Sequence, residues 1–440
     1  MWSRCLRRRY PLSLRVLWFV ALPLAIVCTM VRAVSARALL TVGLTSLIVA
    51  VACGGESNPF KVKTERVTQA DSVDAMQFAP DGRLFYAQQL SGDVRIINAD
   101  GSPQSEPFAH VDVALNIEWG LTGLALDPDF ATNHYVYIYY SEPVSEREET
   151  ITPAPGTTGS PTTTARKTAR PVVVRFTDRS GKGEEQKVIV GDLPETFPEH
   201  SGFNANGKIH FGKDGFLYLS VGDYDVQFNV PDHPSQNLST PIGKLLRVKK
   251  EDGTAAPGNP FLGRPDADPR IFALGFREPF DFGVHPQTGK IYGDDNTPVN
   301  CEELNIIEPG ANYGWPKVGE FPYPQCGAGD QKQAIHYFAR EGKQPSDFLS
   351  FVEVSSFAFI TAAKYPTLGD SMLVCQLGSE TAAGPAQPRM RRLTLAPPEF
   401  DQVTADDVVV KDCKLSLAVS PDGTVYYSND KEIRKMLPES

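Results

Sequence analysis

Short apolar segments of alternating pattern, each interrupted by a polar turn, recur along this chain. In the clearest copy, Lys213-Asp214-Gly215 predicts a tight turn, because Asp and Gly supply the hydrogen bonding and positive φ that a chain reversal needs. Phe216 to Val221 alternates large apolar, aromatic and β-branched residues and predicts a buried strand. The strand ends at Gly222-Asp223, which leaves a carboxylate at the strand end.

Five further copies of this strand–turn–strand pattern lie at 78–87, 126–139, 283–294, 359–377 and 418–428. Six units, tens of residues apart, leave room for about four strands each, which predicts an all-β fold, a six-bladed β-propeller. Pro-Asp-Gly turns are common in any β protein, but here all six lie between strands of similar pattern. The 36 Gly and 36 Pro residues also fit a turn-rich β protein.

Residues 1–52 have the composition of an export signal. They contain seven Arg and no Lys, Asp or Glu, and their two apolar runs are shorter than the roughly 18–20 residues of a membrane span. The second run ends in Ala50-Val51-Ala52-Cys53, which resembles a bacterial lipoprotein signal. A start at Met30 would give such a signal its normal length, and a single anchor helix is the alternative. We therefore predict an exported, membrane-anchored lipoprotein at the cell surface or in the periplasm.

In this interpretation Cys53 carries the lipid, residues 53–63 form a tether, and residues 64–440 form the propeller. The segment 144–170 is rich in Thr, Pro and Gly and poor in apolar residues, so we predict a disordered insertion between strands of the second blade. The strand is expected to resume at Val172.

The charge after residue 52 argues against nucleic acid as a partner. All 53 acidic residues and only 36 of the 43 basic ones follow residue 52, which gives a formal charge of −17. An acidic chain repels phosphate backbones.

Four cysteines remain once the signal and the lipidated residue are set aside: Cys301, Cys326, Cys375 and Cys413. An even number in an exported protein suggests two disulfides. Their places in the repeat scheme favour the pairs Cys301–Cys326 and Cys375–Cys413. No pair has the spacing of a zinc site.

In a propeller, polar groups at the strand ends converge on one face of a central channel. The candidates here are Glu118, the loop at 200–207, Asp223, Arg277, Glu278, Asp294, Asp295, Lys411 and Lys414. We expect Glu118, Asp223, Arg277, Glu278 and Asp295 to converge, and we expect the Arg277 charge to hold its carboxylate neighbours ionised.

Several strings, in order along residues 65–437, resemble the soluble-type glucose/sorbosone dehydrogenases, also called aldose sugar dehydrogenases. They are Glu118-Trp-Gly-Leu-Thr-Gly-Leu-Ala-Leu-Asp-Pro-Asp-Phe130, the segment 207–223, Gly243-Lys-Leu-Leu-Arg-Val248, Ala273-Leu-Gly-Phe-Arg-Glu-Pro279 and the segment 302–316. That family consists of six-bladed propellers that use pyrroloquinoline quinone (PQQ).

The resemblance implies oxidation of the anomeric carbon of a sugar, with PQQ and calcium as cofactors. A general base takes the hydroxyl proton while hydride passes to the quinone, and a cation stabilises the developing charge. Arg277 matches the family's cofactor-polarising Arg, and Asp223 matches the Asp that orients the base. Two structural alternatives stay open: Arg277 in an ion pair between blades, and Asp223 capping a turn.

The departures from the family pattern bear on activity. The position of the family's His base is Asn204, and an amide cannot accept a proton at neutral pH. His200, four residues earlier, would serve if its loop bulges. Glu278 stands where the family has Asn, Asp295 lies near the position of a cofactor-contacting Gln, and Cys413-Lys414-Leu415-Ser416 replaces an Arg cluster.

PQQ carries three carboxylates and needs cations, so these changes predict weaker binding unless Lys411, Lys414 and Arg391 compensate. Two other functions therefore stay open. One is a cofactor-free propeller that binds a glycan or a protein. The other is a calcium-dependent hydrolase or lactonase, in which Glu118, Asp223, Glu278, Asp294 and Asp295 would bind Ca²⁺.

Overall fold

The computed structural model describes Phe60 and residues 62–438, apart from 116–117, 152–161, 197–203, 206, 317–321, 324, 328, 379, 382–383 and 386. The chain divides into two compact units, Met1–Ser57 and Asn58–Ser440, and every described residue belongs to the second. The predicted export signal, Cys53 and His200 lie outside the described residues. Within the described part of the chain, no helix is long and apolar enough to cross a membrane.

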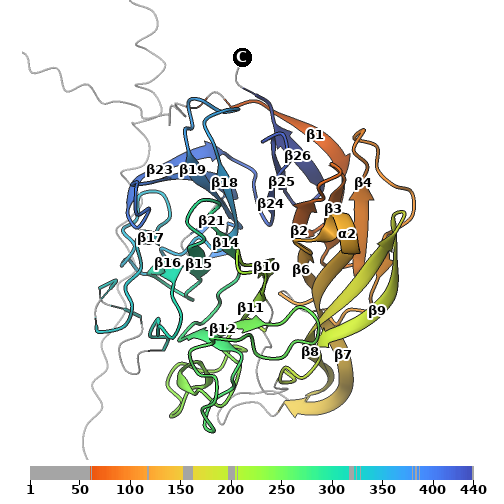
Figure 1. Ribbon diagram of the computed structural model, residues 1–440. Coiled ribbons are helices and arrows are strands. Elements are labelled where there is room, and N and C mark those ends of the chain that lie inside the picture. Colours follow the sequence, from red (N-terminus) through yellow and green to blue (C-terminus); the bar gives the residue numbers. More distant parts are fainter. Residues whose placement is uncertain are drawn as a thin grey trace, which may run out of the picture. The chain divides into compact units, whose positions relative to one another are not determined.

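Six four-stranded antiparallel sheets follow one another around a ring, which confirms the six-bladed propeller (Figure 1). The innermost strands, each of which contacts the innermost strand of the next blade, are β2 (Val73–Phe78), β6 (Leu121–Leu126), β10 (Ile209–Phe211), β14 (Phe282–Val284), β18 (Val354–Ile360) and β24 (Leu417–Val419). The second strands are β3 (Leu84–Gln88), β7 (Tyr135–Ile151), β11 (Leu217–Val221), β15 (Ile291–Asp295), β19 (Ser371–Gln376) and β25 (Val425–Ser428).

The third strands are β4 (Asp93–Ile97), β8 (Thr162–Arg179), β12 (Lys244–Val248), β16 (Glu302–Ile307), β22 (Arg389–Leu395) and β26 (Glu432–Met436). The outermost strands are β5 (Ala109–His110), β9 (Lys182–Val190), β13 (Ile271–Leu274), β17 (His336–Phe338), β23 (Val403–Val410) and β1 (Thr64–Gln69). The short elements outside the blades are the helix α2 (Phe130–Asn133), the 3-10 turn η1 (Pro234–Gln236) and the hairpin β20 (Glu380–Thr381) with β21 (Gly384–Pro385).

The sixth blade is completed by a strand from the other end of the described chain. β1 pairs with β26 in antiparallel register, from Thr64 opposite Met436 to Gln69 opposite Glu432 (Figure 1, β1 in orange beside β26 in dark blue). The repeat pattern alone did not identify β1 as this closing strand.

Alternation along the strands builds the core between blades. In β7, Val136, Ile138 and Tyr140 pack with residues of the first blade, whereas Tyr137 and Tyr139 pack with residues of the third. Since successive side chains of a strand point to opposite faces of its sheet, one strand serves two interfaces.

A buried ion pair joins three blades at the channel. Lys208 Nζ donates to Asp74 Oδ1 (2.6 Å) and to the carbonyl of Thr122 (3.0 Å). Lys208 and Asp74 are both nearly inaccessible to solvent. The ammonium group thereby ties the start of the third blade to the first two.

The prediction of a disordered insertion at 144–170 is wrong for the part that the structure describes. β7 and β8 form a continuous antiparallel ribbon that extends to the pair Ile151–Thr162, and β8 begins at Thr162 rather than at Val172. Low apolar content argued against a packed core, but a two-stranded ribbon continuing a blade needs only backbone pairing, and Thr favours extended backbone. Residues 152–161 lie outside the described residues.

Both predicted disulfides are confirmed. Cys301 pairs with Cys326, and Cys375 pairs with Cys413. The first closes a loop of 25 residues in the fourth blade. The second joins β19 of the fifth blade to the segment that enters the sixth.

Candidate functional site

The backbone of Arg277 links the ends of two strands in neighbouring blades. The N–H of Asp223, just after β11, donates to the carbonyl of Arg277 (2.7 Å). The N–H of Arg277 donates to Asp295 Oδ1 at the end of β15 (2.9 Å), and the N–H of Glu278 donates to the same oxygen (2.8 Å). Arg277 is therefore fixed between the third and fourth blades before its side chain makes any contact.

Asp223 is buried, and both of its carboxylate oxygens accept hydrogen bonds. Oδ1 accepts from Asn204 Nδ2 (2.9 Å) and from the N–H of Asp225 (2.8 Å). Oδ2 accepts from Trp315 Nε1 (2.8 Å), and His233 Nε2 lies 4.0 Å from it. Asp223 thus caps a turn, as one alternative held, and it also holds the side chain at position 204.

Asn204 lies directly against the strand end because Gly222 has no side chain. A Cβ at Gly222 would lie 1.9 Å from the carbonyl oxygen of Asn204. Asn204 has a φ of 56°, a conformation in which Asn and His are enriched among non-Gly residues. Its N–H donates to Glu118 Oε2, and its own Oδ1 is buried with no hydrogen-bond partner in the described part of the chain.

The Arg277 guanidinium is the cation at the centre of this site, and 14% of its side chain is accessible. Nη1 donates to Glu278 Oε2 (3.1 Å) and to the carbonyl of Asn296 (2.9 Å). Its charge also acts on Asp223 and Glu118. The predicted convergence of Glu118, Asp223, Arg277, Glu278 and Asp295 is therefore observed.

The expectation that the Arg277 charge controls the ionisation of these carboxylates is not met, because burial raises the pKa of each of them. Burial raises the pKa of Asp223 to about 6, although Arg277, Asn204 and Trp315 act in the opposite direction. Burial also raises the pKa of Glu118, and it raises the pKa of Glu278 and Asp295 well above the usual range. One guanidinium shared among several buried acids does not offset the loss of hydration and their mutual repulsion.

The acidic residues predicted to bind calcium are not gathered into a group of metal ligands in the described part of the chain. Among the described residues, no group of three or more His, Cys, Asp or Glu side chains is arranged to hold a metal ion. Asp295 instead accepts backbone N–H groups, and Asp294 Oδ1 accepts from the N–H of Asp281 (2.8 Å). These carboxyl groups stabilise loops at the ends of the strands.

The predicted cationic residues of the sixth blade are engaged elsewhere. The Lys414 ammonium pairs with Asp430, in the same blade. Lys411 is exposed. The Lys414 ammonium therefore does not take the place of the family's Arg cluster. His200 lies outside the described residues.

Trp315 and His233 were not predicted as site residues, although both are buried and lie against Asp223. His233 Nδ1 accepts from the N–H of Ser235, so Nε2 carries the proton and faces the carbonyl of Val226. Burial lowers the pKa of His233 to about 4, so the ring is neutral at pH 7. The Trp315 signal was present in the segment 302–316, but nothing in the sequence showed where the indole points.

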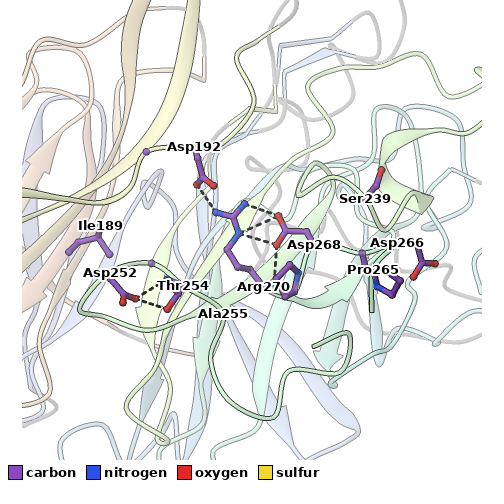
Figure 2. A pocket seen from close by; sticks show the side chains of 14 residues that line it. Ile189, Asp192, Ser239, Asp252, Thr254, Ala255, Pro265, Asp266, Asp268 and Arg270 are labelled. Carbon is purple, nitrogen blue, oxygen red and sulfur yellow. Dashed lines mark hydrogen bonds and ion pairs between the residues drawn. The ribbon is translucent and has the colours of Figure 1, made fainter. Parts of the chain in front are cut away.

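A cavity of about 740 Å³ opens away from these residues. Its lining includes Asp192, Asp252, Asp266, Asp268 and Arg270, and none of the predicted site residues. Figure 2 shows the Arg270 guanidinium between two carboxylates, at 2.6 Å from Asp192 and 2.7 Å from Asp268. Arg270, the one cation among the described lining residues, is thus paired with two carboxylates of the same cavity wall.

Comparison with known proteins identifies the family. A family model described as Glucose / Sorbosone dehydrogenase matches residues 71–437. The chain belongs to the glucose/sorbosone dehydrogenase family. This confirms the resemblance that the strings around Asp223, Arg277 and Trp315 suggested.

The relatives differ in the fraction of their length that this chain matches. Aldose sugar dehydrogenase from Escherichia coli is 23% identical over 83% of this chain and 89% of its own length. Quinoprotein glucose dehydrogenase B from Acinetobacter calcoaceticus is 25% identical over 56% of this chain, which spans 50% of that protein. An uncharacterised protein from Synechocystis is 26% identical, and the match again spans only 56% of its length.

Among solved structures, the PQQ-bound aldose sugar dehydrogenase from Streptomyces coelicolor has a TM-score of 0.61 and 20% identity, over 87% of this chain and all of that one. At this identity the likeness bears on the fold alone.

Proposed function

We propose that this protein is a sugar dehydrogenase that oxidises the anomeric carbon of a sugar, with pyrroloquinoline quinone as electron acceptor. The observation that supports it most is the placement of Arg277. Its charge is fixed from both sides by backbone bonds to Asp223 and Asp295, beside a buried carboxyl group and an amide in the position of the family's base.

The residues fit the cofactor at its reacting edge. A permanent, preorganised and partly accessible guanidinium suits an oxygen on which negative charge develops. The unpartnered Asn204 Oδ1 leaves an acceptor beside Asp223 that a hydroxyl group of a substrate would satisfy. When bound, PQQ would supply the two-electron acceptor for the hydride.

The chain must also take the proton of the sugar hydroxyl. Asn204 cannot do this, so the candidates are His200 and Asp223, whose pKa of about 6 leaves it largely ionised at pH 7.5. Asn204 would position the hydroxyl group, and Arg277 would stabilise the charge that develops as hydride leaves.

Two variants separate these roles. Asn204→His restores the family's base beside Asp223, and the backbone conformation at 204 tolerates His. If Asp223 serves as a poor base, this change should raise kcat by about 10²-fold or more. If His200 is the base, His200→Ala should abolish turnover and Asn204→His should change little.

The decisive experiment titrates the purified apo-protein with PQQ, with and without Ca²⁺, and follows the quinone absorbance and dye reduction with a panel of aldoses. Saturable quinone binding and sugar-dependent dye reduction are expected. Neither signal, in the wild type or in Asn204→His, would overturn the proposal.

A second function is favoured by one specific observation. Arg277 is the only cation that the described residues place at the site, and it is already paired with Glu278, whereas a tricarboxylate ligand needs more positive charge than one guanidinium supplies. A propeller that binds a neutral glycan without cofactor would not meet this conflict. Binding of a glycan by a protein that fails to bind PQQ would support it.

The protein is also proposed to be exported and anchored through a lipid on Cys53. The string Ala50-Val51-Ala52-Cys53 and the two disulfides support this, since disulfides persist in oxidising compartments. Mass spectrometry of the mature N-terminus should find a lipidated Cys53. An intact N-terminus at Met1 in the membrane fraction would contradict the assignment.

A further inference from the structure

A cavity of about 570 Å³ between the fourth and fifth blades is lined by an unusual excess of cations. Arg340 and Lys343 come from the loop after β17, and Arg389 and Arg391 come from β22. Among the described lining residues, Glu341 is the one that carries a carboxylate. We call this the basic cavity. It contrasts with the acidic chain around it and with the 740 Å³ cavity, in which carboxylates outnumber the single Arg.

Two of these guanidinium groups are held in place by carboxylates at the margin. Arg389 Nη2 donates to Glu341 Oε2 (2.8 Å), and more than half of the Glu341 side chain is exposed. Arg391 Nε donates to Asp406 Oδ1 (2.5 Å), and Asp406 Oδ2 lies 3.0 Å from His336 Nε2. A guanidinium has five N–H donors in a planar fork, so one such bond orients the group without exhausting its donors.

Gln376 adds a second, independent observation. It is the last residue of β19, it lines the basic cavity, and only 2% of it is accessible. Its Nε2 is buried and has no hydrogen-bond partner among the residues that the structure describes. Because buried polar groups in native proteins are nearly always paired, this donor lacks an oxygen that a ligand in the cavity would supply.

A short series of contacts connects the basic cavity to Arg277. Gln376 lies opposite Val354 in the ladder between β18 and β19. Val354 exchanges two hydrogen bonds with the side chain of Asn296, at 2.8 and 2.9 Å. The carbonyl of Asn296 accepts from Arg277 Nη1 (2.9 Å). Two intermediate residues, Val354 and Asn296, thus join a lining residue of the basic cavity to Arg277.

We propose that the basic cavity binds a carboxylate group of the ligand whose reacting part lies at Arg277. The inference rests on the proposed function, which it deepens by naming the anionic part of that ligand. The carboxylate has two possible sources, the quinone cofactor or an acidic sugar of the uronate type. In either case the cavity supplies cations that the sixth blade, with Lys414 paired to Asp430, does not.

Binding to the apo-protein tests this without reference to turnover. PQQ is titrated by its absorbance, and D-glucuronate and D-glucose by calorimetry, with the wild type, Arg389→Gln and Lys343→Gln. Lys343 is exposed, so its variant should fold normally if Arg389→Gln does not. The matched control is Arg179→Gln, which also removes a cation paired with a glutamate, Glu185, but in the second blade.

Arg389→Gln and Lys343→Gln should each raise the Kd of PQQ, of glucuronate or of both by about tenfold. Arg179→Gln should leave both Kd values unchanged. If PQQ alone responds, the cofactor is the source of the carboxylate. If glucuronate alone responds, while glucose is bound equally by all variants, the substrate is the source. Added salt should weaken the binding of the same anion that the variants affect, because the contact is between charges.

The proposal is overturned if neither anion binds the wild type, or if both bind the two cavity variants as tightly as they bind the wild type. Failure of the proposed function gives a different result. In that case glucuronate binding still depends on Arg389 and Lys343, while no sugar reduces a dye in the presence of PQQ.

Discussion

The ends of β11 and β15 occupy the same position in neighbouring blades, yet their carboxyl groups have different surroundings. Asp223 accepts three hydrogen bonds, from two side chains and one backbone N–H, beside the Arg277 charge. Asp294 accepts from the N–H of Asp281 through Oδ1, while its Oδ2 is buried without a partner in the described part of the chain. Asp281 and Asp295 add negative charge nearby.

The difference shows that donors, and not burial alone, decide whether a buried acid can ionise. Burial raises the pKa of both groups, but that of Asp223 only to about 6 and that of Asp294 well above the usual range. Asp223 can therefore exchange a proton near neutral pH, whereas Asp294 holds its proton more strongly.

The largest effect is expected from removing the charge that distinguishes the two ends. Arg277→Met keeps the backbone bonds to Asp223 and Asp295 but should lower kcat about 10²- to 10³-fold, because the side chain stabilises charge that develops during reaction. The pKa of Asp223 should rise further, since Arg277 lowers it, while Asp294 should not respond. Steady-state kinetics and pH profiles measure both. A raised KM with an unchanged kcat would mean that Arg277 only binds the ligand.

An intermediate effect is expected at Asp223, the carboxyl group that accepts three hydrogen bonds. In Asp223→Asn the new NH₂ group faces either the Trp315 N–H or the donors on Oδ1, so at least one buried donor loses its acceptor. The free energy of unfolding at pH 7.5 should fall by about 1–3 kcal/mol. Urea denaturation followed by tryptophan fluorescence measures it. An unchanged midpoint would show that water or a shifted loop replaces the lost acceptor.

The smallest effect is expected at Asp294, which accepts fewer hydrogen bonds, and this effect depends on pH. Asp294 has a higher pKa folded than unfolded, so its contribution to stability is complete below the unfolded pKa near 4 and is lost as the pH rises toward the folded pKa. Asn keeps the acceptor for Asp281 and does not titrate. Of the pH values above 4, Asp294→Asn should thus be nearest to wild type at the lowest, pH 4.5.

Above that pH, Asp294→Asn should become the more stable protein, by up to about 1.4 kcal/mol for each pH unit. Denaturation at pH 4.5, 6 and 7.5 measures the trend. Parallel curves for the variant and the wild type would mean that Asp294 is ionised in the folded protein.

Much of the fold could be predicted because it depends on local alternation and turn chemistry. The pattern around Asp214-Gly215 recurs in all six blades, and the Cys pairs follow from the blade order. Two features of the fold were not predicted from the sequence. β1 completes a sheet with a strand from the far end of the chain, and the low apolar content that argues for disorder at 144–170 is compatible with the ribbon of β7 and β8.

The sequence predicted which residues come together at the candidate site, but it did not predict their pKa values. Strand-end positions brought Glu118, Asp223 and Arg277 together correctly, because the propeller fixes where strand ends lie. Their pKa values depend on hydration and on donors such as Trp315, which the order of residues along the chain does not specify. The direction of Lys414 and the cations of the basic cavity likewise depend on side-chain packing.

The pairing of β1 with β26 has a consequence for how quickly the native state can be reached. A contact between Thr64 and Met436 is among the most distant along the sequence that this chain can make, and such contacts form slowly because the intervening chain must be ordered first. Until they form, β26 is an unpaired edge strand, which is a template for association with another chain. The step that pairs β1 with β26 is therefore also a step at which nascent molecules are exposed to aggregation, and a truncation that removes β1 would leave β26 permanently unpaired on that side.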